Sequence, residues 1–438
     1  MRLLRISSDS GLSLTNNLGG NDLTNGGGKD KPGYKKTLLC GEQARRDGLQ
    51  YFWVDTCCIN KVNKGGLSQA INSMFRWYRD ATRCYVYLSD VSNPTSQTDE
   101  EDFGLSVWES DFCKSRWFTR GWTLQELLAP DSVEFFSQEW KRLGDKASLR
   151  QQIHEITRIP DSALQGAPLA QFDVEERLSW NIHRHTKLKE DRVYSLLGIF
   201  DVYISPFYGE GVSRALERLQ EQINKRKRCT EDLRPTDPRD DKTRIEDTKG
   251  GLLKDSYRWI LNNADFRQWR DDEQSQLLWI KGDPGKGKTM LLCGIIDELQ
   301  KWKAKTDLLS FFFCQATDSR INNATAVLRG LLYMLVDQQP SLVSHIRKKH
   351  DDAGKALFED VNAWVALTEI FTSVLQDPSL RSTCLIIDAL DECVLDLPKL
   401  LEFVAQQSAP SRVKWVVSSR NWPEIEEQLE RAGYKHLH

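Results

Sequence analysis

Residues 277–302 read LLWIKGDPGKGKTMLLCGIIDELQKW, and this stretch decides the fold of the C-terminal part of the chain. An apolar run comes first, and an apolar run at helical spacing comes last. Between them lies a segment that fits the pattern G-x-x-x-x-G-K-[ST] in its strand, loop and helix setting. Its residues are Gly282, Asp283, Pro284, Gly285, Lys286, Gly287, Lys288 and Thr289. The stretch therefore predicts a P-loop that binds a nucleoside triphosphate.

The residue types in this loop suit phosphate chemistry. Glycines let backbone N–H groups close around phosphates, and the N-terminus of the following helix adds a partial positive charge. We assign all eight residues to nucleotide binding. Lys288 is expected to hold the β and γ phosphates, and Thr289 is expected to contact Mg²⁺. The alternative is a glycine-rich turn without a ligand.

An acidic cluster follows a second apolar run in CLIIDALDEC, Cys384 to Cys393. Acids at the carboxyl end of a strand lie where α/β sheets bind ligands. Asp388 fits the metal role of holding Mg²⁺ through water. Asp391 or Glu392 would polarise the attacking water, and we favour Glu392. The alternative is that these acids only cap a helix.

A third strand, VKWVV, ends at Ser418-Ser419-Arg420 and would bring a cation to the same sheet edge. Arg420 is the candidate sensor of the nucleotide state and a catalytic candidate. A further strand, Leu308 to Gln315, and a helix, Ala324 to Gln338, complete four predicted strands. Residues 251–438 are therefore predicted to form an α/β sandwich of the P-loop NTPase class.

Together GDPGKGKT, LIIDALDEC and VVSSR resemble the NACHT domain, a family of signal-transducing P-loop NTPases of the STAND class. The resemblance implies a switch that is closed with ADP and oligomeric with ATP. It also implies ATP or GTP with Mg²⁺ as ligands, slow hydrolysis at most, and a homo-oligomer formed through this domain. Because the family continues into helical and sensor regions, we expect the domain to be incomplete at its C-terminal side.

The N-terminal half alternates between strand and helix patterns. Tyr51 to Asp55, Cys84 to Leu88 and Val133 to Phe136 read as strands. Apolar residues at helical spacing from Leu67 to Tyr78, and a run from Thr123 to Leu128, read as helices. This alternation favours a parallel sheet flanked by helices.

Three runs, residues 51–61, 70–91 and 115–130, resemble the fungal heterokaryon-incompatibility (HET) domain. EERLSW (175–180) and EDRVYSLLGIFDV (190–202) resemble the extension that follows this domain when it is fused to NACHT. HET domains are similar in layout to Toll/interleukin-receptor (TIR) domains. The resemblance therefore implies a TIR-like domain over 37–140 and a helical extension over 141–228.

By analogy with TIR domains, Glu126 is the candidate acid for cleavage of NAD⁺, with Asp55 and Trp122 lining the cleft. A carboxylate beside Trp117 and Trp122 could stabilise an oxocarbenium-like centre while the rings stack on nicotinamide. The alternative is that Glu126 is a structural residue near the N-terminus of a helix, among core tryptophans.

Two segments read as irregular. Residues 12–36, rich in Asn, Gly, Asp and Lys, occupy the place of the first HET strand, so we expect 1–36 to be irregular and incomplete. An inactive or poorly folded copy therefore remains an alternative. The charged, proline-containing stretch 229–250 is the predicted linker.

Composition sets wider bounds. The formal charge of −3 gives no basic field that would favour nucleic acid. No apolar run is long enough to span a membrane, and the N-terminus lacks a signal peptide, so we expect a soluble, cytoplasmic protein. The ten cysteines form no CxxC pair and are interpreted as reduced core residues rather than metal ligands.

These observations lead to one hypothesis and three rivals. The hypothesis is a nucleotide-controlled switch that oligomerises and clusters HET effector domains, thereby triggering heterokaryon incompatibility, programmed cell death or an immune-type response. Its partners would be other HET-containing or signalling proteins. The rivals are a TIR-like NAD⁺ glycohydrolase, an adaptor without chemistry, and an inactive truncated product.

Overall fold

The computed structural model describes residues 4–5, 32–59, 62–93, 107–252, 254–272, 277–302, 307–408, 413–430 and 435–437. The chain divides into two compact units, Met1–Ile223 and Asn224–His438. The boundary falls within helix α12 (Val212–Leu233). No described helix is long and apolar enough to cross a membrane.

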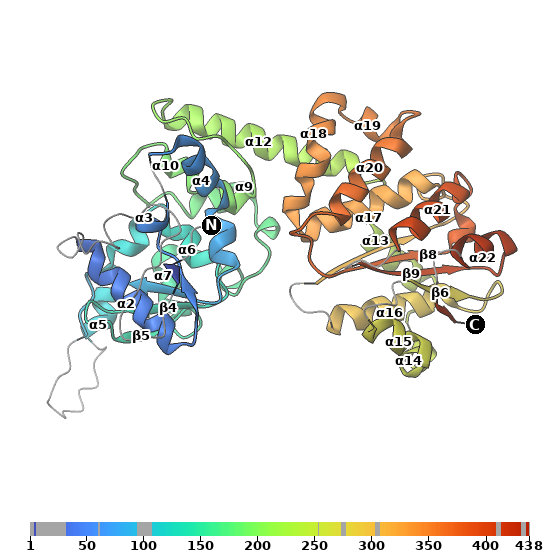
Figure 1. Cartoon of the computed structure of the whole chain (residues 1–438), viewed down its shortest axis with the longest axis horizontal. Helices are drawn as coiled ribbons and strands as arrows, with labels where there is room; N and C mark the ends of the chain where they lie inside the picture. The colour runs from blue at the N-terminus through green and yellow to red at the C-terminus, as the bar shows by residue number, and fades with distance from the viewer. Residues whose placement is uncertain are drawn as a thin grey trace. The chain divides into compact units, whose positions relative to one another are not determined.

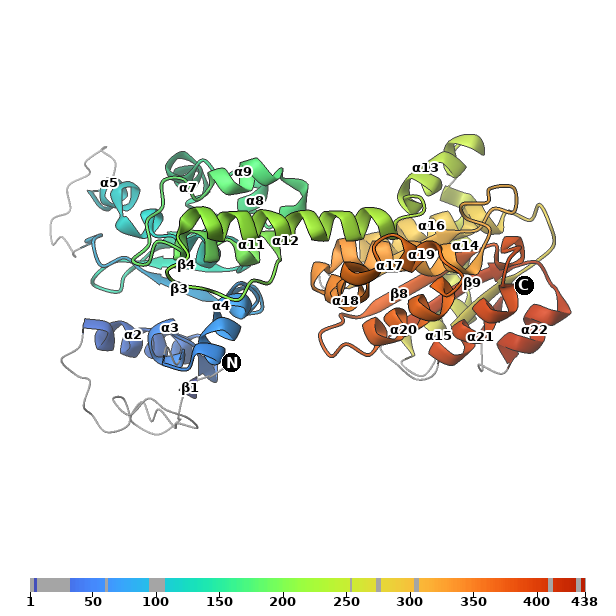
Figure 2. The ribbon, with the colours of Figure 1, turned by 90° about the horizontal axis from the view of Figure 1, so that it is seen from above.

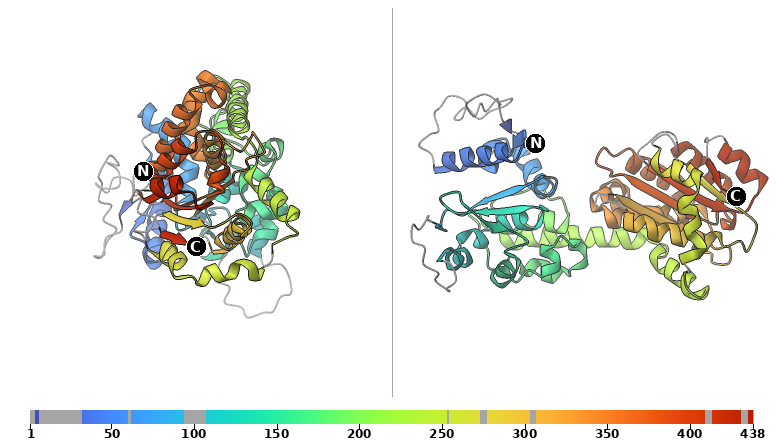
Figure 3. Two further views of the ribbon diagram at one scale, coloured as in Figure 1. Left: turned by 90° about the vertical axis from the view of Figure 1, so that its right-hand side faces the viewer. Right: turned by 90° about the horizontal axis from the view of Figure 1, so that it is seen from below.

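The first unit contains a three-stranded sheet in the order β3-β4-β5. β3 (Cys84–Tyr87) runs parallel to β4 (Val133–Phe136), and β5 (Arg142–Asp145) runs antiparallel to β4. Every residue of β4 is buried, which is typical of a strand covered on both faces. α2 (Pro32–Arg46) and α3 (Asp55–Cys58) lie on one side of this sheet (Figures 2 and 3).

Helices supply most of the remaining structure of the first unit. The predicted helix Thr123–Leu128 is confirmed as α6, which carries Glu126. The other helices are α4 (Lys64–Arg79), α5 (Val107–Lys114), α7 (Arg150–Thr157), α8 (Asp161–Leu164), α9 (Val174–Ser179), α10 (Asp191–Tyr194) and α11 (Leu197–Phe200). The region predicted to be a helical extension contains α7 to α11 and the start of α12.

The predicted strand Tyr51 to Asp55 is wrong in length and in partner. β2 spans only Tyr51–Phe52 and pairs antiparallel with β1 (Leu4–Arg5) rather than with the β3-β4-β5 sheet. The strand ends early because α3 begins at Asp55. Trp53 packs edge-on against Trp77 and Tyr78 of α4 instead of continuing a ladder. The sheet is thus mixed, with a single parallel pair among the described residues.

The predicted irregular segment is partly helical, because residues 32–36 belong to α2. Proline is tolerated in the first turn of a helix, where its missing N–H group would have no partner. Thr37 and Ala44 are buried, so the helix packs one face against the unit. Most of the segment 1–36 lies outside the described residues.

The second unit is a parallel sheet of five strands in the order β10-β6-β9-β8-β7. The α/β class predicted for this part is confirmed. The strands are β6 (Leu277–Lys281), β7 (Leu308–Phe313), β8 (Thr383–Asp388), β9 (Val413–Ser419) and β10 (Lys435–Leu437). The edge strand β10 was not predicted, since its three residues form too short a run to be recognised.

Helices cover both faces of this sheet (Figure 1). Figure 1 shows α14, α15 and α16 below the strands, and α17, α20, α21 and α22 above them. The helices are α13 (Pro238–Thr248), α14 (Lys254–Asn262), α15 (Ala264–Asp271), α16 (Lys288–Trp302), α17 (Ala324–Gln338), α18 (Val343–Ala353), α19 (Ala356–Glu359), α20 (Ala363–Leu375), α21 (Leu397–Gln407) and α22 (Pro423–Glu430). α17 lies so close to β7 that a Cβ at Gly330 would come within 2.3 Å of the Phe312 ring.

The predicted linker 229–250 is largely helical, formed by the end of α12 and by α13. Cys229 and Leu233 are buried in the core of the second unit, which ties α12 down. Pro238 starts a helix instead of breaking one, because Asp237 caps the N–H group of Arg239. The charge and proline content of 229–250 therefore led to the prediction of a linker where the structure has packed helices.

Candidate functional site

The P-loop forms where β6 ends and α16 begins, as predicted. Residues 283–287 are exposed, and Gly285 and Gly287 have φ of +75° and +79°. Side chains with a Cβ rarely adopt such angles, so the turn depends on glycine at these two positions. The loop thereby presents its backbone at the carboxyl edge of the sheet, in front of a helix N-terminus.

The Lys288 side chain turns back onto this loop. Its ammonium group donates hydrogen bonds to the carbonyl oxygens of Gly282, at 2.6 Å, and Asp283, at 3.1 Å. These acceptors are neutral, so a phosphate group would bind the ammonium more strongly than they do. Lys286 is exposed and makes no such contact in the loop.

Asp388 lies at the end of β8, where its side chain is buried among oxygen-bearing groups. Ser418 donates a hydrogen bond of 2.5 Å to it, and Thr289 bonds to it as well. Burial raises the pKa of Asp388 to about 6, against the effect of these two hydroxyl groups. The nearby charges that act on it, Asp391 and Glu392, are acidic. The structure thus brings the two predicted Mg²⁺ residues, Thr289 and Asp388, together.

This oxygen environment fits a hydrated Mg²⁺ ion. Magnesium is usually bound by one or two carboxylates together with substrate phosphates and water. Among the described residues, no group of three or more His, Cys, Asp or Glu side chains is placed to hold a metal by itself. A magnesium ion at Thr289 and Asp388 would therefore depend on the nucleotide phosphates.

Ser418 is a residue that sequence reasoning missed. β9 lies between β6 and β8, so the end of β9 comes beside both Asp388 and the strand that enters the loop. The Ser418 hydroxyl also accepts a 2.9 Å hydrogen bond from the Ala389 N–H group. Ala389 has a φ of +54°, a left-handed conformation that is costly for alanine and that this bond helps to hold. The small residue after Asp388 was the only signal in the sequence.

Arg420 is paired with Asp391, an arrangement the sequence did not predict. The Asp391 carboxylate accepts hydrogen bonds from the backbone N–H of Arg420, at 2.8 Å, and pairs with its guanidinium at 3.1 Å. The Asp391 side chain is 4% exposed, whereas that of Arg420 is 43% exposed. Glu392 turns elsewhere and accepts a 3.1 Å hydrogen bond from the N–H of Ala316, after β7. The three candidates thus have three different settings, and only Asp391 and Arg420 contact each other.

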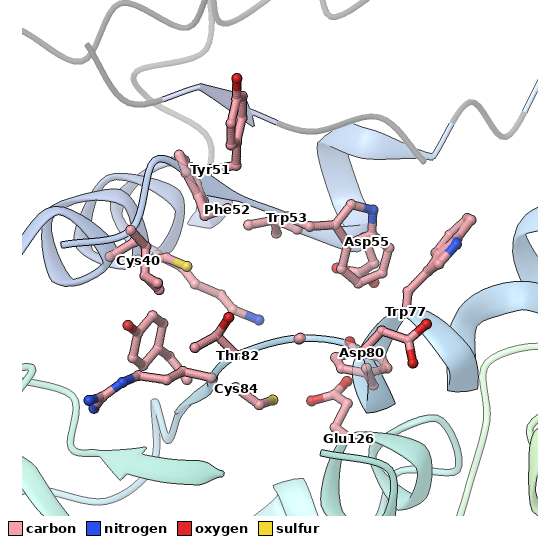
Figure 4. Close-up of a pocket in the computed structure, with 18 of the residues that line it drawn as sticks. Cys40, Tyr51, Phe52, Trp53, Asp55, Trp77, Asp80, Thr82, Cys84 and Glu126 are labelled. Carbon is pink, nitrogen blue, oxygen red and sulfur yellow. The ribbon is translucent and has the colours of Figure 1, made fainter. Parts of the chain in front are cut away.

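A second candidate site is a cavity of about 460 Å³ in the first unit (Figure 4). Its size lies within the range of small-molecule sites. α2, the segment 51–55, α4, β3 and α6 all contribute to its wall. Figure 4 shows Trp53 and Asp55 on one side of the cavity and Cys84 and Glu126 on the other. The cavity therefore contains two of the acids predicted for the HET region.

Glu126 is held by two aromatic side chains. Trp117 donates a 3.2 Å hydrogen bond from its indole Nε1 to the carboxylate, and Tyr78 also hydrogen-bonds to it. Burial raises the pKa of Glu126 above its usual range, while the charge of Lys36 opposes the shift. A carboxyl group in such a site suits acid–base or charge-stabilising chemistry.

The predicted roles of two tryptophans are wrong. Trp122 precedes α6 and packs against the hydrophobic core of the unit, not against the cavity. Trp117 is 8% exposed, packs against Phe118 and Phe135, and is not among the residues that line the cavity. Trp53 and Trp77 line the cavity instead. They come from segments far from α6 in sequence, so spacing could not identify them.

Two protein families match this chain, one in each of its two compact units. Residues 255–420 match the family described as nephrocystin 3, N-terminal. Residues 40–104 match the family described as heterokaryon incompatibility protein (HET). The HET match includes most of the cavity wall but ends before Glu126.

One curated relative aligns with nearly all of the chain. The vegetative incompatibility protein HET-E-1 of Podospora anserina is 61% identical over 415 residues, which are 94% of this chain and 30% of the relative. The chain thus spans less than a third of that relative's length. The chain thus contains a segment similar to the HET family, followed by a segment similar to the N-terminal region of nephrocystin 3, and it aligns over nearly its whole length with a vegetative incompatibility protein.

Proposed function

We propose that this chain acts in heterokaryon incompatibility as a nucleotide-controlled switch. The P-loop region binds ATP or GTP with Mg²⁺ and then oligomerises. Oligomerisation clusters the HET regions, which trigger incompatibility or cell death. The observation that carries the proposal is the contact of Thr289 with Asp388 beside a loop over which Lys288 is held, in a chain 61% identical to a vegetative incompatibility protein over 415 residues.

Nucleotide binding accounts for the features of this edge better than a structural turn does. A structural turn has no need of a half-buried lysine held over the loop or of a buried carboxylate with two acidic neighbours. A bound nucleotide would place phosphates beside Lys288 and a magnesium ion beside Asp388. The metal would neutralise the phosphates, while the loop N–H groups and Lys288 would orient them.

Calorimetry of ATP and GTP binding in the presence of Mg²⁺ tests this claim. Lys288→Ala should weaken binding roughly 100-fold, because one charge-assisted contact is lost. Lys286→Ala is the matched control, since it removes an exposed lysine of the same loop, two residues away. Equal affinity in the two variants would reject the assignment of the site.

A specific observation supports a second function, cleavage of NAD⁺ or a related glycoside in the first unit. Glu126 faces a cavity lined by Trp53, Trp77 and a second acid, Asp55. The carboxylate would stabilise positive charge on the sugar, and the half-buried rings of Trp53 and Trp77 would stack on the departing base. Clustering by the switch would then raise the activity of neighbouring HET regions.

The test is consumption of NAD⁺ by the assembled protein, with Glu126→Gln as the variant of similar shape. Cleavage by the wild type and none by Glu126→Gln supports chemistry. If neither cleaves NAD⁺ while both still trigger cell death, the HET region is an adaptor that recruits partners through its surface.

A further inference from the structure

The turn and helix that carry Glu126 are held by a side chain from outside the HET match. Arg184 lies in the helical extension, and it is 3% exposed. Its guanidinium donates hydrogen bonds to the carbonyl oxygen of Arg120, at 3.0 Å, and to the hydroxyl of Thr123, at 2.9 Å. These two groups lie just before α6 and in its first turn.

Thr123 continues this contact to the residue that holds Glu126. Its hydroxyl lies 2.6 Å from the carbonyl oxygen of Trp117 and 2.7 Å from that of Arg120, so these two oxygens share its one hydrogen, while it accepts from Arg184. Trp117 in turn donates its indole N–H to Glu126. Arg184 is therefore connected through Thr123 to the backbone of Trp117, the residue whose indole side chain contacts the carboxylate.

The backbone around Arg184 is joined to the same turn. The N–H of Gly121 donates to the carbonyl of His185, at 3.0 Å, and the N–H of His185 donates to the carbonyl of Thr119, at 2.6 Å. A Cβ at Gly121 would lie 2.5 Å from the methyl group of Thr186, so only glycine allows this approach. The extension thus lies directly on the segment that leads into α6.

Burying the guanidinium of Arg184 costs free energy that a purely structural role does not explain. A buried cation is normally paired with an acid, yet no acidic group lies within ion-pair distance of Arg184 among the described residues. One of its nitrogen atoms, Nη2, is buried without a hydrogen-bond partner in that part of the chain. The charge that favours its ionised form is that of Glu126.

We propose that Arg184 is a positioning residue for Glu126, so that the extension and the HET region form one site. It acts by fixing the Thr123 hydroxyl and the Trp117 turn. Glu126 alone would contact the ligand. The proposal rests on the second proposed function, because positioning Glu126 matters only if this residue takes part in cleavage. The contacts between Arg184 and the Trp117 turn can nevertheless be tested without any substrate.

The test uses the whole chain labelled with ¹⁵N-tryptophan, and it follows the indole N–H resonance of Trp117, identified by its loss in Trp117→Phe. Glu126→Gln should shift this resonance, because the acceptor of the indole changes. Arg184→Gln should shift it as well, and the double variant should show less than the sum of the two shifts, since both act on one hydrogen bond. Arg184→Lys should restore only part of the wild-type position, because lysine keeps the positive charge but lacks the planar, several-donor guanidinium group.

Arg177→Gln is the matched control. Arg177 also belongs to the extension, where it donates to the carbonyl of Ile199 and lies over the Phe200 ring. Its loss should leave the Trp117 resonance unchanged. If Arg184→Gln does not fold, Thr123→Val interrupts the same path with a side chain of equal size.

The outcomes separate the two proposals. A Trp117 resonance that responds to Glu126→Gln but not to Arg184→Gln or Thr123→Val would overturn the positioning role. Shifts in all of these variants, in a protein that cleaves no NAD⁺, would support the positioning role and reject the second function.

Discussion

The phosphate loop and the N-terminal cavity are built in opposite ways. The loop is one continuous segment, 282–289, exposed at a sheet edge and shaped by glycines. The cavity is lined by side chains from α2, α4, β3 and α6, and its acid is held by Trp117, nine residues earlier, and by Tyr78 of α4. A change in the loop should therefore alter ligand binding and leave the fold intact, whereas a change at the cavity should alter stability and function together.

The largest expected effect concerns the buried carboxylate Asp388. Its pKa rises from an unfolded value near 3.8 to about 6 in the folded protein, so the folded state binds a proton that the unfolded state releases. This contribution is favourable below pH 4 and is lost as the pH rises through 6. Without nucleotide, the wild type should lose on the order of 2 to 3 kcal/mol relative to Asp388→Asn between pH 4 and 7. Denaturant unfolding at several pH values measures this, and parallel curves for the two proteins would contradict it.

Trp53→Ala probes the cavity side of the comparison. Trp53 packs edge-on against Trp77 and Tyr78, so its removal should cost about 2 kcal/mol of unfolding free energy. The affinity for ATP should not change. Trp302→Ala is the control, since Trp302 is 45% exposed and should cost less than about 0.5 kcal/mol. Equal costs for the two variants would mean that Trp53 does not support the cavity wall.

Gly287→Ala probes the loop side. Gly287 and Gly209 both have positive φ, +79° and +99°, and a Cβ at either position would meet no atom within 4 Å. Alanine should thus cost about 1 to 2 kcal/mol of backbone strain at either position. Only Gly287→Ala should weaken ATP binding, by about tenfold, as measured by calorimetry. A similar loss of affinity in Gly209→Ala would show that the effect is not local to the loop.

The smallest expected effect is the coupling between Asp391 and Arg420. Because the Arg420 side chain is 43% exposed, solvent screens the pair. A double-mutant cycle with Asp391→Asn and Arg420→Gln should give about 1 kcal/mol without nucleotide. If ATP draws Arg420 toward the phosphates, the coupling should fall when ATP is added. A coupling that ATP leaves unchanged would argue against a sensor role for Arg420.

The sequence predicted most of the second unit because its signals are local. The strand, glycine loop and helix around Lys288 are adjacent along the chain, and Asp388 follows its own buried strand. The Ser418 contact could not be predicted, since it depends on β9 lying between β6 and β8. Neither could the pairing of Arg420 with Asp391, for the same reason.

The first unit was harder to predict because its site depends on packing between distant segments. The helix carrying Glu126 was correct in its bounds, but the tryptophans that line the cavity are Trp53 and Trp77. The strand at Tyr51 was too long, because an apolar run does not show that α3 begins at Asp55. The segment 229–250 is a packed segment and not a linker. Its sequence is mostly charged, and two buried apolar residues, Cys229 and Leu233, are too few to form a recognisable helical pattern.

The central claim is that nucleotide controls assembly, and light scattering measures it most directly. The mass of the purified chain should be determined with and without ATP and Mg²⁺, for the wild type and for Lys288→Ala. The proposal predicts that ATP raises the mass of the wild type only. If the wild type binds ATP in calorimetry and its mass stays the same, the P-loop is a binding site without a switch.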